Sequence, residues 1–280
     1  MLVVIGDLVA DLIVLGGSML ERGTDNPAEV RLTRGGSAAN VAVAAVSRHP
    51  VRFIGCVGDD TLGRTLVRDL EDAGVDARVQ RTGRTGAIVV LVDAVGERTM
   101  ITDRGAAAEL GPIDASWLTD AEWVHLPLYG FTSPRSRQAL LEVTRGLAER
   151  GVPVSLDLSS TATMRALGGE VLNGIIAEVA PSVVFANADE AALAVELRCE
   201  PAGSVVYVVK RGGDPAVVRF GGESLEVPVD RVPDVLDSTG AGDAFAAGYL
   251  TAAVAGATAY DSARAGSVLA MSALRRAGAL

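Results

Sequence analysis

The sequence predicts an α/β fold built on a central, mostly parallel sheet. Short β-rich runs alternate with longer helical runs, for example at 123–126, 133–150, 152–156 and 183–185. This alternation is typical of right-handed βαβ units. Two glycine-rich stretches also lead directly into alanine-rich helical runs. The chain has 280 residues, 49% of them apolar, which is enough for one large domain with a small appendage.

Composition excludes several classes of partner. The net charge of −10 argues against nucleic acid and against anionic membrane surfaces. Cys56 and Cys199 are far apart in sequence, so we expect free thiols in a cytoplasmic protein. The apolar start, 2–6, is followed by Asp7 and Asp11 and has no basic region before it. It is expected to be a strand and not a signal peptide, and no apolar run is long enough to span a membrane.

The most informative stretch is D-S-T-G-A-G-D at 237–243, followed by an apolar helical run. A hydroxyl residue there, such as Thr239, can cap a helix. The small residues Gly240, Ala241 and Gly242 leave backbone N–H groups open at the positive end of the helix dipole, where they attract an anion such as phosphate. Asp243 would then accept a proton from a hydroxyl that attacks phosphorus. A plain helix cap is the alternative, and a dinucleotide fingerprint fits less well.

This stretch resembles the C-terminal signature of the ribokinase-like (PfkB) carbohydrate and nucleoside kinases, D-[TS]-x-G-A-G-D. The matching residues are Asp237, Ser238, Gly240, Ala241, Gly242 and Asp243. The resemblance implies that Asp243 is the catalytic base and that Gly240, Ala241 and Gly242 form the anion hole. It further implies that Thr239, Gly240 and Gly242 contact ATP, with a monovalent cation such as K⁺ at Asp237 as an additional option.

The earlier glycine stretch, R-G-G-S-A-A-N at 34–40, resembles the family's N-terminal signature, G-G-x-x-x-N. The resemblance implies that Gly35 and Gly36 let the backbone approach a sugar and that Asn40 hydrogen-bonds its hydroxyls. Asp11, just after the first strand, is then expected to bind sugar hydroxyls as well. Arg104 has two interpretations. It is either a surface charge or a substrate contact, as in family members that phosphorylate sugar acids.

Two further stretches bear on ATP. Asn187 and Glu190 match the family's N-x-x-E motif, which implies that Glu190 holds Mg²⁺ through water and that Asn187 lies near ATP. Taken alone, the pair is equally well explained as a capping box. Lys210 and Gly212 stand in a strand-and-turn segment that the family places against the nucleotide phosphates, although Pro215 departs from the pattern. A Walker-type phosphate loop is absent from the sequence.

The resemblance runs along nearly the whole chain and implies one ribokinase-like domain, 1–280. We expect a three-layer sandwich with a central, mostly parallel sheet, plus a small β-sheet lid formed by about 9–33 and 76–103. An isolated small sheet exposes edges and apolar area. We therefore expect the lid to pack against its copy in a homodimer.

The expected activity is ATP-dependent phosphorylation of a hydroxyl group of a small sugar or sugar acid, with Mg²⁺. A nucleoside kinase of the same fold is the first alternative. The aromatic content of 4% argues mildly against it, because a base usually stacks on a ring. A non-catalytic sugar or nucleotide sensor is the second alternative, and the intact Asp243 argues against that.

Overall fold

The computed structural model describes residues 1–16, 20–93, 98–230, 232 and 239–275. Within these residues the larger sheet has nine strands. In spatial order they are β13 (Glu223–Val227), β12 (Asp214–Phe220), β11 (Val206–Arg211), β10 (Val183–Asn187), β9 (Val154–Asp157), β8 (Trp123–Pro127), β1 (Leu2–Gly6), β4 (Val51–Val57) and β5 (Asp76–Arg81). The parallel strands of this sheet are β11, β10, β9, β8, β1, β4 and β5, and β12 and β13 add an antiparallel edge. The sheet is therefore mostly parallel, as predicted.

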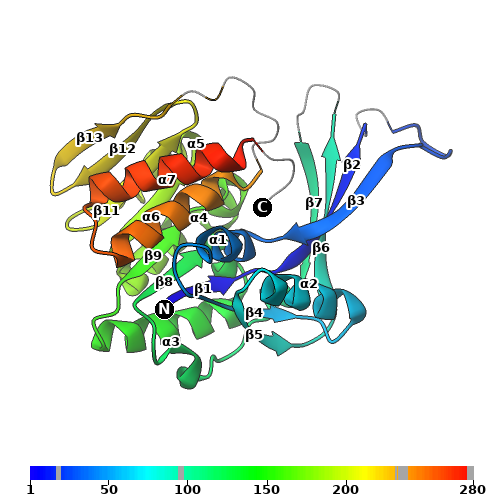
Figure 1. The fold of residues 1–280 in the computed structure, drawn as a ribbon, viewed down its shortest axis with the longest axis horizontal. Coiled ribbons are helices and arrows are strands. Elements are labelled where there is room, and N and C mark those ends of the chain that lie inside the picture. The colour runs from blue at the N-terminus through cyan, green and yellow to red at the C-terminus, as the bar shows by residue number, and fades with distance from the viewer. Residues whose placement is uncertain (17–19, 94–97, 231, 233–238, 276–280) are drawn as a thin grey trace.

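Helices cover both faces of this sheet (Figure 1). One buried cluster joins the sheet to α1 (Ser37–Ala45), α2 (Thr61–Asp72), α6 (Ala241–Val254) and α7 (Ala259–Ala273). The other joins it to α3 (Pro134–Glu149), α4 (Thr161–Val179) and α5 (Ala188–Glu196). Strand β1 shows why two cores form. Leu2 and Val4 face the first cluster, whereas Val3 and Ile5 face the second, because side chains alternate along a strand. This confirms the three-layer sandwich.

Most helices begin with a polar side-chain cap. Asp60, Ser133, Ser160 and Thr258 each accept a hydrogen bond from the backbone N–H three residues further on. Helices α1 and α6 begin instead at glycines. Gly36 has φ 102° and Gly240 has φ 71°, and neither helix start carries a side-chain cap among the described residues. In α1, however, the N–H groups of Ala38 and Ala39 donate to Asp7 Oδ1 and to the Asp7 carbonyl oxygen. The first N–H groups of α6, uncapped among the described residues, remain open to another partner.

A smaller sheet rises beside the larger one (Figure 1). Its strands, in spatial order, are β3 (Glu29–Gly35), β2 (Val9–Leu15), β6 (Thr85–Val92) and β7 (Arg98–Gly105). The second segment of the expected lid, about 76–103, was predicted to begin too early. Residues 76–81 do not belong to the smaller sheet. β5 instead pairs in parallel with β4 at the edge of the larger sheet, because the β4–α2–β5 segment is one more βαβ unit. The antiparallel strands β12 and β13 lie outside what the sequence predicted.

Some expectations fall on residues outside the described ranges. These are the expectations for Asp237 and Ser238 of the C-terminal signature. Three short 3₁₀ helices, Ala106–Ala108, Ala115–Leu118 and Leu128–Phe131, complete the described elements. Both cysteines are buried and free, as expected. In the described part of the chain, we find no helix with the length and apolar character needed to cross a membrane.

Candidate active site

A cavity of about 980 Å³ lies between the carboxyl ends of the large-sheet strands, the smaller sheet and the starts of α1 and α6. Ligand sites of parallel sheets form at this end of the strands. Every described candidate residue except Gly35 lines this cavity. These are Asp11, Gly36, Asn40, Arg104, Asn187, Glu190, Lys210, Gly212, Thr239, Gly240, Ala241, Gly242 and Asp243. Residues that are up to about 230 positions apart in sequence therefore share one site.

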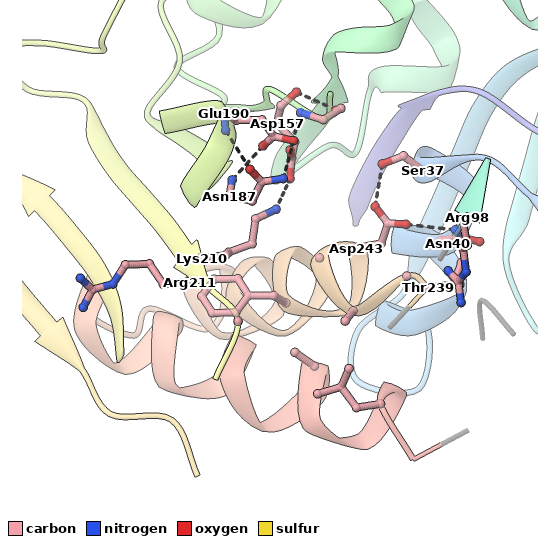
Figure 2. Close-up of a pocket in the computed structure, with 18 of the residues that line it drawn as sticks. Ser37, Asn40, Arg98, Asp157, Asn187, Glu190, Lys210, Arg211, Thr239 and Asp243 are labelled. Carbon is pink, nitrogen blue, oxygen red and sulfur yellow. Dashed lines mark hydrogen bonds and ion pairs between the residues drawn. The ribbon is translucent and has the colours of Figure 1, made fainter. Parts of the chain in front are cut away.

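Asp243 ends the second glycine stretch and lies in the first turn of α6, facing α1. Ser37 Oγ donates a hydrogen bond to Asp243 Oδ1 at 2.7 Å, and Asn40 Nδ2 donates one to Oδ2 at 3.0 Å (Figure 2). Both donors come from α1, so the two sequence signatures meet at one carboxyl group. The N-terminal signature implied that Asn40 binds the sugar, whereas in the structure its side chain contacts Asp243. Ser37 was not among the expected site residues, and its only signal in the sequence is its place between Gly36 and Asn40.

The environment of Asp243 favours a carboxyl group that exchanges its proton near neutral pH. Desolvation raises its pKa from 3.8 to about 7, against the hydrogen bonds from Ser37 and Asn40, which lower it. The charge of Asp157 raises the pKa further, and Lys210 lowers it. A general base works best when its pKa lies near the operating pH. The observed arrangement therefore suits proton abstraction from an alcohol.

The start of α6 forms the wall beside Asp243. The left-handed backbone at Gly240 turns the chain into the helix without a side-chain cap. A Cβ atom at Gly242 would lie 3.4 Å from Lys210 Nζ, so the ammonium group and the open helix start face the same space. The helix dipole and the lysine together make this wall a site for an anion.

A buried charged cluster lies at the ends of β9, β10 and β11. Lys210 Nζ contacts Asp157 Oδ2 at 2.8 Å (Figure 2). Burial alone would lower the pKa of Lys210, but the carboxylates of Asp157 and Glu190 outweigh it and raise that pKa. Desolvation, followed by the charge of Asp157, raises the pKa of Glu190 to about 7.

The capping box that the sequence allowed at α5 is present. Asn187 N–H and Nδ2 each donate to the Glu190 carboxylate at 2.8 Å, and Glu190 N–H donates to Asn187 Oδ1 at 2.8 Å. Glu190 also lines the cavity. The described residues contain no cluster of three or more His, Cys, Asp or Glu side chains that could hold a metal ion. The oxygen donors present fit an ion held through water and phosphate oxygens.

Asp11 occupies the other end of the cavity, on β2. Its Oδ1 atom is buried and has no hydrogen-bond partner in the described part of the protein. Desolvation, with the charge of Asp7, raises its pKa to about 6, whereas Arg34 and Arg98 lower it. A Cβ atom at Gly35 would lie 2.2 Å from Asp11 Oδ1. Gly35 therefore makes room for this carboxyl group and does not itself line the cavity.

Arg104 is a cavity residue and not a surface charge. Its Nη1 atom donates to Asp7 Oδ2 at 3.2 Å, and its guanidinium carbon lies 3.9 Å from the centroid of the Tyr129 ring. Arg98, on the same strand β7, also lines the cavity. Positions 98 and 104 differ by an even number, so both side chains project from the same face of the small sheet. That face covers the cavity.

Comparison with known proteins identifies the family. The model of the pfkB family carbohydrate kinases matches residues 1–280. An ATP-dependent ribose-1-phosphate kinase of Halopiger xanaduensis is 38% identical over 81% of this chain and 76% of that protein. A 2-dehydro-3-deoxygluconokinase of Dickeya dadantii is 28% identical over 96% of both chains. A probable sugar kinase of Rhizobium etli has a TM-score of 0.88 at 25% identity, over 99% of this chain and 94% of that one.

A sugar kinase of Pyrococcus horikoshii in complex with ATP has a TM-score of 0.86, over 100% of this chain and 94% of that one. At 23% identity, this similarity shows the fold alone. The fold, the two glycine signatures and the match over the full length agree. The chain belongs to the pfkB family of carbohydrate kinases, enzymes that transfer a phosphoryl group from ATP to a sugar.

Proposed function

We propose that this protein uses ATP to phosphorylate a hydroxyl group of a small sugar or sugar acid, with Asp243 as the general base. One observation carries the proposal. The Asp243 carboxyl group lies between the open start of α6 and the donors Ser37 and Asn40, and its pKa is raised to about 7. A carboxylate beside an anion site is electrostatically costly, and proton abstraction during phosphoryl transfer gives it a task.

The chemical step follows from the placement of these side chains. The sugar binds near Asp11 and Gly36, with the reacting hydroxyl at Asp243. Asp243 takes the hydroxyl proton, the oxygen attacks the γ-phosphorus of ATP, and the bond to the ADP oxygen breaks. The N–H groups of the α6 start and the Lys210 ammonium group hold the negative charge on the transferring group. These groups are aimed at the anion before the reaction begins, so little reorganisation is needed.

We propose Mg²⁺ as the divalent cation that accompanies ATP. Asn187 and Glu190 would hold it through water, and when bound it offsets the charge of the phosphates. Two buried acids, Asp157 and Glu190, stand near a single lysine, and this excess of negative charge favours a cation in the space between them.

Arg98 and Arg104 line the cavity from the small sheet, and their positive charges favour a sugar that carries an anionic group. Guanidinium groups bind phosphate and carboxylate oxygens in forked geometry. The relatives named for ribose 1-phosphate and for 2-dehydro-3-deoxygluconate also act on anionic sugars. A nucleoside fits less well, because Arg104 covers one face of the Tyr129 ring, and a base would need an open ring for stacking.

The test is release of ADP from a panel of ribose, ribose 1-phosphate, fructose, 2-dehydro-3-deoxygluconate and adenosine. We expect one of the two anionic sugars to have the highest kcat/KM. Asp243→Asn should lower kcat on that substrate by roughly 100-fold or more, the usual effect of losing a general base, while ATP still binds. Adenosine as the best substrate would make the nucleoside kinase the correct alternative. Near-normal turnover of the Asp243→Asn variant would remove the catalytic assignment.

The outer face of the small sheet suggests a homodimer, which we propose as the assembly of this cytoplasmic enzyme. Leu32 and Ile101 are each 60% exposed, and Val30 is 58% exposed. The strand register places Leu12, Val89, Leu32 and Ile101 side by side across four strands, on the face opposite the cavity. Exposed apolar area of this kind is characteristic of an interface, and a second copy supplies a matching face.

A further inference from the structure

Arg34 lies behind the site and is not among the residues that line the cavity. It stands near the end of β3, directly before the two glycines of the N-terminal signature. Its Nη1 atom donates to Asn40 Oδ1 at 3.1 Å. Asn40 Nδ2 in turn donates to Asp243 Oδ2 at 3.0 Å. The three side chains form a connected series, from a permanent positive charge, through one amide, to the carboxyl group at the start of α6.

The chemistry of these groups fixes the direction of each hydrogen bond. A guanidinium group has only donors, so Asn40 must present its carbonyl oxygen to Arg34. The NH₂ group of Asn40 then faces Asp243 and can only donate. A donor facing a carboxyl oxygen stabilises the ionised form. If the amide turned over, its oxygen would face Asp243 and accept a hydrogen bond from the protonated form instead.

We infer that Arg34 is a positioning residue for phosphoryl transfer, because it holds the Asn40 amide in the orientation that keeps Asp243 ionised. The inference rests on the proposed function, in which Asp243 is the base. Arg34 does not touch the reacting atoms and acts through Asn40. Its removal is therefore expected to change the protonation of Asp243, an effect that a role in packing alone would not produce.

Other charged groups lie around these three side chains. The charge of Asp157 raises the pKa of Asp243 and the charge of Lys210 lowers it. The charge of Asp243 in turn raises the pKa of Tyr129. Arg34 lies near Asp69 and Asp11 as well as Asp243. The direct attraction between Arg34 and Asp243 favours the ionised carboxylate, which is the same direction as the effect through Asn40. Removal of Arg34 should therefore raise the pKa of Asp243, and no group in this set reverses that sign.

The experiment is the pH dependence of kcat/KM for Arg34→Met, Arg34→Lys and the control Arg31→Met. Arg31 lies on the same strand, has its side chain 51% exposed and pairs with Glu29. kcat/KM reports the pKa of the free enzyme. We expect the acidic limb of Arg34→Met to move up by about one pH unit, which lowers kcat/KM about tenfold below neutral pH and leaves the alkaline plateau within about threefold. Arg34→Lys should move the limb less, and Arg31→Met should not move it.

A double variant tests whether the effect passes through Asn40. Arg34→Met should shift the acidic limb of the pH profile by less in the Asn40→Ala background than in the wild-type background. In that background the hydrogen bonds from Arg34 through Asn40 to Asp243 are already lost. A uniform loss of kcat/KM at all pH values, with the limb unmoved, would show a structural role only and overturn the inference. If Arg34→Met does not fold, the comparison of Arg34→Lys with the wild type decides it. Full activity of Asp243→Asn would instead remove the proposed function itself.

Discussion

Gly35→Ala is the substitution whose effect on sugar binding follows most directly from the geometry of the site. A Cβ atom at position 35 would lie 2.2 Å from Asp11 Oδ1, 2.3 Å from Cγ and 2.5 Å from Oδ2. All three atoms belong to one side chain, and no backbone atom stands closer. Gly35 does not have a positive φ, so alanine itself is compatible with the backbone. The added methyl group therefore displaces the Asp11 carboxyl group and leaves the strand in place.

The size of the effect follows from what Asp11 contributes. Asp11 lines the cavity, and in the proposed function its carboxyl group accepts a hydrogen bond from a sugar hydroxyl. A hydrogen bond to a charged group contributes about 1.5–3 kcal/mol, so its loss should raise the KM for the sugar roughly 10- to 100-fold. The KM for ATP should change less than twofold, because the α6 start and Lys210 lie at the other end of the cavity.

The assay is a steady-state titration of each substrate, with thermal unfolding measured in parallel. Asp11→Asn serves as the positive comparison, since it weakens the same acceptor without adding volume. Gly146→Ala serves as the control, because a Cβ atom there meets nothing within 4 Å. A sugar KM within twofold of wild type for Gly35→Ala would refute the reasoning. So would a loss of Tm as large as that of a buried core substitution, since the clash would then lie in the backbone.

Three further predictions test other parts of the structure. Desolvation raises the pKa of Asp243 from its ordinary value of 3.8 to about 7 in the folded protein, so between these pH values the native state keeps a proton that the unfolded chain releases. Stability should therefore fall as pH rises from about 4 to 7, and the Asp243→Asn variant should have a higher Tm than wild type at pH 8, with the gap closing towards pH 4. Glu190→Gln should raise the Mg²⁺ concentration needed for half-maximal rate without changing the sugar KM, and an unmoved Mg²⁺ titration would leave the capping box as the only role of Glu190. Leu32→Asp should convert a dimer to a monomer in light scattering, and a wild-type protein that is monomeric at micromolar concentration would rule out the proposed interface.

The fold was largely predictable because its signals are local. The βαβ alternation and the two glycine stretches can be read over short windows, and both appear in the structure where they were expected. The errors concern long-range pairing. Residues 76–81 read as a strand equally well in either sheet, and only the pairing with β4 decides between them. Strands β12 and β13 have no helix between them, so the βαβ rhythm gave no indication of this antiparallel edge.

The site was predictable residue by residue but not contact by contact. Sequence patterns indicated Asp243 and Asn40 as candidate site residues. The contact between their side chains was not predictable, because it joins positions 203 residues apart. The same holds for Ser37, whose partner Asp243 is 206 residues away. The glycine at 35 shows the same limit. The family resemblance implied that Gly35 lets the backbone approach a sugar. In the structure, the space beside Gly35 is filled by the carboxyl group of Asp11.

The meeting of α1 and α6 at one carboxyl group explains why the two glycine signatures belong together. Each helix begins at a glycine with positive φ. At the start of α1 the N–H groups of Ala38 and Ala39 donate to Asp7, whereas the start of α6 has no side-chain cap among the described residues and lines the cavity. The first turn of α1 supplies the donors that hold Asp243, and the first turn of α6 supplies Asp243 itself. A shift of α1 relative to α6 would therefore change the position and the pKa of Asp243, the proposed base, together. In the proposed function, the packing of these helices on one core cluster therefore positions Asp243 as well as stabilising the fold.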